Sequence, residues 1–201
     1  MLEAQTLSGG FVDPVIEAQS IFRQLMDAMA HPATIARVNT TVQAPDSLPI
    51  AQAAIALTLL DHETPAWLAP SVAQDAVRAW VTFHTGVALT EVMSDARFAF
   101  LGKSDPLPDF IGFELGSPDY PDRSATLIVE VEALEGGPPL HALGPGIDGS
   151  RTVSPRGLPP DFVRRWMANH ASYPRGLDLI LTADRHFMCM PRTTSLIKTE
   201  A

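Results

Sequence analysis

Hydrophobic positions recur along this chain at two spacings, one typical of helices and one typical of strands. In residues 13–32 apolar side chains return every three or four positions, which predicts an amphipathic helix. Asp13 is the expected N-cap, Pro14 suits the first turn, and Pro32 should end the helix. The expected inward positions are Ala18, Ile21, Phe22, Leu25 and Met29.

Three further segments have helical patterns. The segment from Pro49 to Leu60 is apolar on nearly every face, which predicts a helix deep in the core. Ser71 is the expected cap of a helix that reaches His84, and a short helix is expected over residues 160–169.

The strand-like segments differ between the two halves of the chain. Early strands, expected at residues 33–39, around Trp67 and at 97–102, alternate with helices. Later strands form two expected hairpins, 124–134 with 139–147 and 176–182 with 186–191. We therefore expect one layered α/β domain over residues 1–201, with a mixed sheet. The proline-rich stretch 103–123 is too long for a simple connector and is a candidate binding loop or interface arm.

Composition and charge narrow the class of protein. The formal net charge of -9 argues against general nucleic-acid binding, which relies on clustered Lys and Arg. The charge is uneven, with 6 basic and 19 acidic residues in 1–150 but 8 basic and 4 acidic in 151–201. The basic segment could meet an anionic ligand or an acidic partner, or it could be ordinary solvated surface. No membrane-spanning run and no signal-peptide pattern is present, so a cytoplasmic location without membrane contact is expected.

Catalytic chemistry has little support in the sequence. Cys189 lies between two methionines in an apolar run and should be buried rather than nucleophilic. The six histidines are dispersed, so no metal site is expected, and no residue set resembles a catalytic triad. A Schiff-base lysine could only be Lys103 or Lys198, and neither is well placed. We therefore expect no cofactor and assign no catalytic residue.

Two short motifs are candidate contacts for an anion or a partner. "GPGI" contains Gly144 and Gly146, whose backbone N–H groups could cradle an oxyanion, although a simple turn explains the motif equally well. "PRTT" follows an expected strand and contains Arg192, Thr193 and Thr194, and Arg175 is expected to be exposed. Asp178 is unusual in an apolar strand and needs a partner, for which Arg192 is one candidate. We expect Arg192 to matter more for assembly or activity than for stability.

Seven segments occur in an order that resembles one known family. They are "FRQLMDAMAHP", "LTLLDHETPAWL", "FHTG", "SATLIVEVEAL", "LGPGI", "YPRGLDLIL" and "PRTT", and together they span Phe22 to Thr194. The ordered set is similar to the PhnH family, the H subunit of the bacterial carbon-phosphorus lyase core complex. One departure is Ala33, where the family pattern is Pro-Gly, so a tight turn there would lack its glycine.

The resemblance implies a role in alkylphosphonate breakdown under phosphate starvation. In that pathway the H subunit works with the G, I and L subunits to attach a phosphonate to ribose C1 of ATP, which releases adenine. The J subunit later cleaves the carbon-phosphorus bond. The family fold is a three-layer α/β/α arrangement that resembles pyridoxal-phosphate-dependent transferases but lacks the cofactor site. Members form homodimers alone and contact G, I and J in the core complex.

These expectations define three hypotheses for function. The first is an accessory subunit that supports assembly and shapes a phosphonate-nucleotide site, which the lack of a catalytic residue set favours. The second is a stand-alone transferase for a phosphorylated small molecule, with "GPGI" and "PRTT" holding the anion. The third is a pyridoxal phosphate enzyme that uses Lys103.

Overall fold

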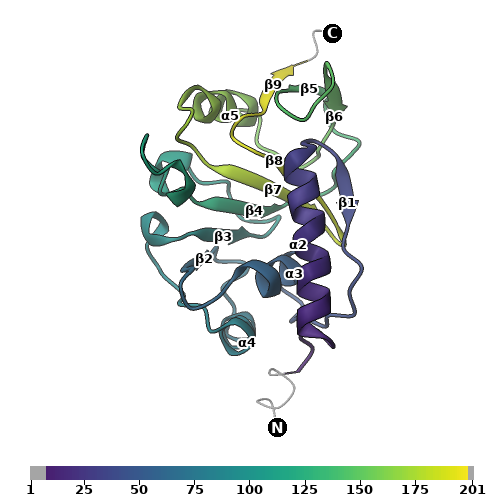
Figure 1. Ribbon diagram of the computed structural model, residues 1–201, viewed down its shortest axis with the longest axis vertical. Coiled ribbons are helices and arrows are strands. Elements are labelled where there is room, and N and C mark those ends of the chain that lie inside the picture. Colours follow the sequence, from purple (N-terminus) through teal and green to yellow (C-terminus); the bar gives the residue numbers. More distant parts are fainter. Residues whose placement is uncertain (1–7, 199–201) are drawn as a thin grey trace.

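A six-stranded mixed sheet in the order β1-β8-β7-β4-β3-β2 forms the centre of the protein (Figure 1). The computed structural model describes residues 8–198. Strands β2, β3, β4 and β7 are parallel, whereas β8 is antiparallel to both β7 and β1. The strand bounds are β1 (Ile35–Arg37), β2 (Ala66–Leu68), β3 (Phe98–Leu101), β4 (Thr126–Glu130), β7 (Asp178–Ala183) and β8 (His186–Met190).

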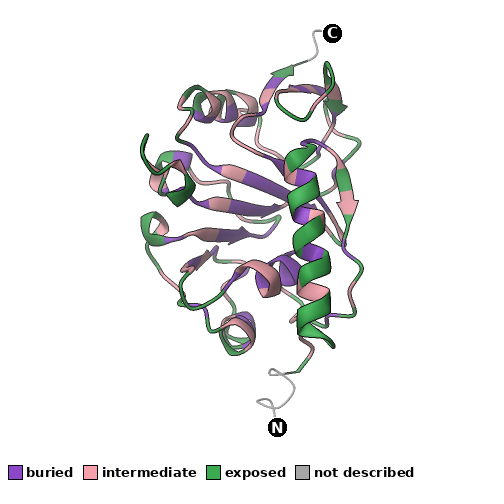
Figure 2. Cartoon of the chain, viewed as in Figure 1, coloured by how far each residue is buried: buried purple, intermediate pink, exposed green. Residues whose placement is uncertain are grey.

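Each face of this sheet is covered by a different set of elements. Three helices pack on one face, α2 (Pro14–Ala30), α3 (Ile50–Leu59) and α4 (Asp75–Thr85). The other face contacts α5 (Phe162–Ala171) and a second, antiparallel sheet of β6 (Arg151–Val153), β5 (Leu140–Leu143) and β9 (Ser195–Lys198). Figure 2 shows that the central strands between these layers are largely buried. The apolar runs of β4 and β7 follow from this burial on both faces.

The first helix and the last hairpin confirm the sequence predictions. Asp13 caps α2, because its carboxylate accepts a hydrogen bond of 3.1 Å from the Ile16 N–H, and Pro14 is the first helical residue. Strands β7 and β8 pair through the turn after Ala183. Both features depend on residues close together in sequence, which is why local patterns identified them.

The predicted hairpin of residues 124–134 with 139–147 is wrong. Strand β4 lies between β3 and β7, so both of its edges are already hydrogen-bonded. Strand β5 therefore joins the second sheet, where it pairs with β6 and β9. The apolar character of β4 on both faces is typical of such an inner parallel strand.

Three finer expectations also need correction. Ser71 does not cap α4, because its N–H and hydroxyl both donate to Asp105 and the helix begins at Asp75. Phe22 faces outward and is 47% exposed, so it does not join the core. The second outer layer combines one helix with a small sheet rather than helices alone.

The long stretch 103–123 contains two short 3-10 helices, η2 (Phe110–Gly112) and η3 (Pro121–Arg123). Phe110 and Phe113 anchor the stretch in the core beside α5. Among residues 8–198, no helix has the length and apolar character needed to span a membrane.

Candidate functional site

A large cleft opens at the carboxyl ends of the parallel strands, where α/β proteins usually bind ligands. Its volume is about 1050 Å³. Several segments contribute to it: the edge strand β1, the loop before α3, the start of β8, and the residues that follow β3, β4, β6 and β7. The strand order brings these segments together although they are far apart in sequence.

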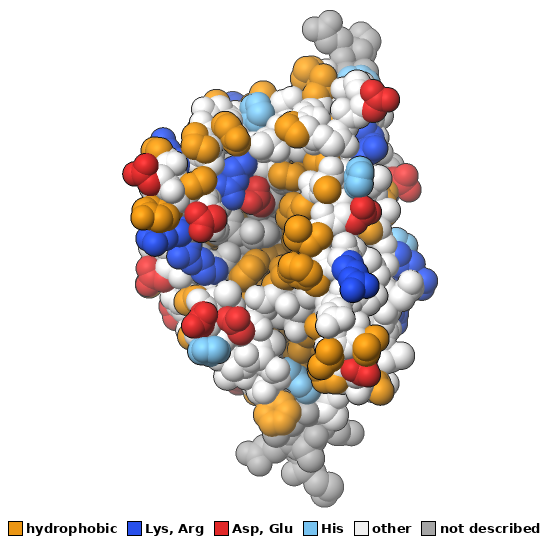
Figure 3. Space-filling view, viewed as in Figure 1, with side chains coloured by type: hydrophobic (Ala, Val, Ile, Leu, Met, Phe, Trp, Pro, Cys, Tyr) orange, Lys and Arg blue, Asp and Glu red, His pale blue; other side chains and the backbone are white. Residues whose placement is uncertain are grey.

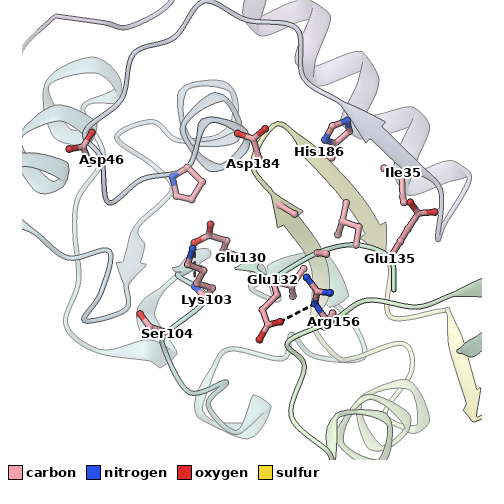
Figure 4. A pocket seen from close by; sticks show the side chains of 15 residues that line it. Ile35, Asp46, Lys103, Ser104, Glu130, Glu132, Glu135, Arg156, Asp184 and His186 are labelled. Carbon is pink, nitrogen blue, oxygen red and sulfur yellow. Dashed lines mark hydrogen bonds and ion pairs between the residues drawn. The ribbon is translucent and has the colours of Figure 1, made fainter. Parts of the chain in front are cut away.

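The lining of this cleft is strongly acidic (Figure 4). Two cationic side chains, Lys103 and Arg156, and the imidazole of His186 are also present. A cleft with this charge repels polyanions such as a nucleoside triphosphate. The five carboxylates belong to Asp46, Glu130, Glu132, Glu135 and Asp184.

Few of these charges are paired within the cleft. Arg156 forms an ion pair of 3.0 Å with Glu132, and the backbone N–H of Lys103 donates to Glu130 at 3.3 Å. Within residues 8–198, the ammonium group of Lys103 makes no ion pair. Lys103 therefore lies at the end of β3 among carboxylates, which is a poor environment for the phosphate of pyridoxal phosphate.

Arg192 directly follows Pro191 after β8. It therefore lies near the amino end of β7, at the opposite end of the strands from the acidic cleft. Its guanidinium donates to both oxygens of Asp178, at 3.1 Å from Nε and 2.6 Å from Nη2. Nη1 donates to the carbonyls of Pro121 and Pro174, and Nη2 donates to the Ser124 hydroxyl. These five bonds match the five N–H donors of a guanidinium. The Asp178–Arg192 pair predicted from the sequence is confirmed, and this geometry favours a structural role for Arg192 over anion binding.

The other candidate contacts fall into two groups. Gly144 and Gly146 pack closely against backbone, since a Cβ on Gly144 would lie 2.7 Å from the Thr193 carbonyl and one on Gly146 would lie 2.0 Å from the Ala30 carbonyl. Thr194 is fully buried, and its carbonyl accepts a hydrogen bond of 2.8 Å from the Trp166 indole. The structure thus brings "GPGI" and "PRTT" together, but as a packed junction. Their role as anion or partner contacts stays a prediction; Gly146 and Arg175 are exposed, and Gly144 and Thr193 are partly exposed.

Cys189 is buried in the core, as predicted. Burial raises the pKa of its thiol to about 12, and the nearby Asp178 carboxylate adds to this effect. A thiol with this pKa is a poor nucleophile at neutral pH. In the described part of the chain, no cluster of His, Cys, Asp and Glu has an arrangement that could hold a metal ion.

Sequence reasoning did not identify the acidic cleft. The one available signal was the segment "EVEALE", which places Glu130, Glu132 and Glu135 after an apolar run. Only the strand order shows that these carboxylates lie beside Asp46 and Asp184.

The fold and the cleft define an α/β protein with an acidic cleft at the carboxyl ends of its parallel strands. Residues 9–197 match the family described as "Bacterial phosphonate metabolism protein (PhnH)". The chain belongs to this family.

Two curated proteins are similar to the chain. It is 50% identical over 194 residues to a Rhizobium meliloti (strain 1021) protein, across 96% of the chain and 97% of that relative. That relative is named "Alpha-D-ribose 1-methylphosphonate 5-triphosphate synthase subunit PhnH". A Stutzerimonas stutzeri protein named "Putative C-P lyase subunit protein HtxG" is 28% identical over 181 residues, across 89% of the chain and 85% of that relative.

Proposed function

We propose that this protein is the H subunit of a cytoplasmic carbon-phosphorus lyase core complex used in alkylphosphonate utilisation. It would support the transfer of a phosphonate to ribose C1 of ATP, with release of adenine, in an accessory role. The observation that carries this proposal is the 50% identity to a named synthase subunit over nearly the full length of both chains. The largely parallel sheet between two outer layers supports the further proposal of a fold like that of pyridoxal-phosphate-dependent transferases.

The site chemistry supports an accessory role over independent catalysis. The main cleft is acidic where a nucleoside triphosphate would need cations, and the Cys189 thiol is protonated at neutral pH. The N–H donors of Arg192 are already used inside the protein, which weakens the alternative of a stand-alone transferase that grips an anion with "PRTT". Residues from partner subunits would therefore have to supply much of the substrate site.

The proposed partners are the G, I and J subunits in the core complex, with the L subunit acting functionally, and a second copy of the chain in isolation. An exposed apolar stripe on α2 supports such contacts, since Val15, Phe22 and Met26 are 65%, 47% and 56% exposed. Their spacing of seven and four positions places them on one side of the helix. Figure 3 shows hydrophobic side chains gathered along α2 beside a hollow in this face. Exposed apolar surface of this kind is typical of interfaces.

Co-expression tests this proposal. The tagged chain is expressed with the G, I and J subunits, and a stable complex should elute together in size-exclusion chromatography. A double substitution, Phe22→Glu with Met26→Glu, should weaken homodimer formation or complex formation without unfolding the protein, because both side chains are exposed. Arg23→Ala, on the same helix, is the matched control. If the wild-type chain forms no stable complex with these subunits, the accessory-subunit proposal fails.

A further inference from the structure

A second pocket contains two arginines that form no ion pair within residues 8–198. It lies at the amino ends of β3 and β4, on the opposite edge of the sheet from the acidic cleft, and has a volume of about 410 Å³. Arg97 directly precedes β3, and Arg123 lies in η3 shortly before β4. Ser94, Asp95 and Ser117 lie beside them, and Glu114 completes the polar lining.

Local contacts hold both arginines in place. The Arg97 guanidinium donates to the backbone carbonyl of Arg123, which couples the two residues directly. The Arg97 carbonyl accepts a hydrogen bond of 2.9 Å from the Thr126 N–H, which ties the start of β3 to that of β4. The Arg123 guanidinium carbon lies 4.1 Å from the centre of the Tyr120 ring, a cation–π contact. These contacts orient the guanidinium groups but use few of the five N–H donors that each one carries.

The carboxylates in the pocket do not pair with the arginines. In residues 8–198, no ion pair involves Arg97 or Arg123, whereas Arg78, Arg165 and Arg192 all have carboxylate partners. The pocket carboxylates have other contacts. Glu114 accepts the Gly116 N–H at 2.9 Å, and Asp95 accepts the Ser94 hydroxyl at 3.3 Å.

Ser117 adds a hydroxyl donor to the pocket. Its oxygen accepts the Tyr120 N–H at 3.0 Å, which leaves its own O–H free to donate to a ligand. Two guanidinium groups and one hydroxyl that share a concave site are a donor set suited to a tetrahedral oxyanion.

We propose that this pocket binds a phosphoryl or phosphonyl group, held by Arg97 and Arg123 with a hydrogen bond from Ser117. Arg97 and Arg123 line the same pocket and neither forms an ion pair with Asp95 or Glu114, so their guanidinium groups can donate charge-assisted hydrogen bonds to a bound anion. Arginine suits this chemistry because its planar fork donates two parallel hydrogen bonds to phosphate oxygens. The proposal does not depend on the role of the chain in a lyase complex, since it rests on the pocket alone.

The test is a titration of the full-length chain followed by ¹H–¹⁵N NMR. Inorganic phosphate and methylphosphonate are added in separate arms, with acetate as a planar monoanion for comparison. Both tetrahedral anions should cause saturable shift changes centred on residues 94–97 and 114–123, and acetate should bind more weakly. Tighter binding of methylphosphonate than of phosphate would identify a phosphonate site, and equal binding would identify a general phosphoryl site.

Two substitutions separate this pocket from the rest of the surface. Arg123→Gln should weaken binding of both tetrahedral anions by about tenfold or more, because it removes a charged bidentate donor. Arg123 is exposed and makes no ion pair, so the fold should survive the change. Arg23→Gln, at an exposed arginine of α2 outside the pocket, is the matched control and should leave binding unchanged. The proposal is overturned if no saturable binding occurs, if Arg123→Gln binds as wild type does, or if the shift changes lie elsewhere.

Discussion

Replacing Arg192 by alanine should strongly destabilise the protein. The side chains of Arg192 and Asp178 are only 12% and 22% exposed, so the substitution leaves a largely buried carboxylate without its cation. It also removes the donors to the Pro121 and Pro174 carbonyls and to the Ser124 hydroxyl. These acceptors belong to two separate segments, residues 121–124 and the loop at Pro174, which Arg192 holds together at the amino ends of β4 and β7.

The size of the effect follows from the burial of the pair. Removing one partner of a fully buried ion pair costs about 3 to 5 kcal/mol, and the residual exposure here favours the lower end, about 3 kcal/mol. In a protein of 201 residues each kcal/mol lowers the melting temperature by about 2 to 4 °C, so the expected decrease is about 6 to 12 °C. This expectation reverses the one drawn from the sequence, in which Arg192 mattered more for assembly than for stability.

Urea denaturation measures the change, provided that the transition is two-state and its slope is unaltered. Arg175→Ala is the control, because that arginine is exposed, and its free energy of unfolding should stay within about 0.5 kcal/mol of wild type. In a double-mutant cycle, Asp178→Ala should cost much less in the Arg192→Ala background than in wild type. If Arg192→Ala matches the control, the hydrogen bonds of its guanidinium are not important for stability and the reasoning is refuted.

Three further predictions concern other positions. The buried Cys189 thiol, with its pKa raised to about 12, should not react with a disulfide reagent at about pH 8 until the protein unfolds. Burial lowers the pKa of His84 below 6.5, so the unfolded chain binds a proton more readily than the folded chain does. The free energy of unfolding should therefore fall as the pH drops below about 6.5. His84→Gln should reduce that fall, as measured by urea titrations at several pH values. Ala33 has a left-handed φ of 62°, so Ala33→Gly should raise the free energy of unfolding by about 0.5 to 1 kcal/mol, and an unchanged melting temperature would argue against backbone strain.

The Asp178–Arg192 pair could be predicted from the local sequence alone. Both residues flank one hairpin, so its register alone was enough to suggest the pair. The other partners of Arg192 come from the segment around Pro121 and from the loop at Pro174, which no hairpin register connects. The same local reasoning therefore identified the ion pair but misjudged the role of the arginine, since only the additional partners use up its donors.

Hydrophobic periodicity and turn residues were sufficient to predict the helix capped by Asp13 and the hairpin of β7 with β8. These elements depend on contacts within about twenty residues, which the sequence displays directly. The neighbours of β4, the acidic cleft and the pocket of Arg97 and Arg123 were decided only in the folded chain. Hydrophobic burial is non-directional, so an apolar strand can satisfy its pattern beside many partners. The packing of the whole chain selects among them, and that choice places distant charges side by side.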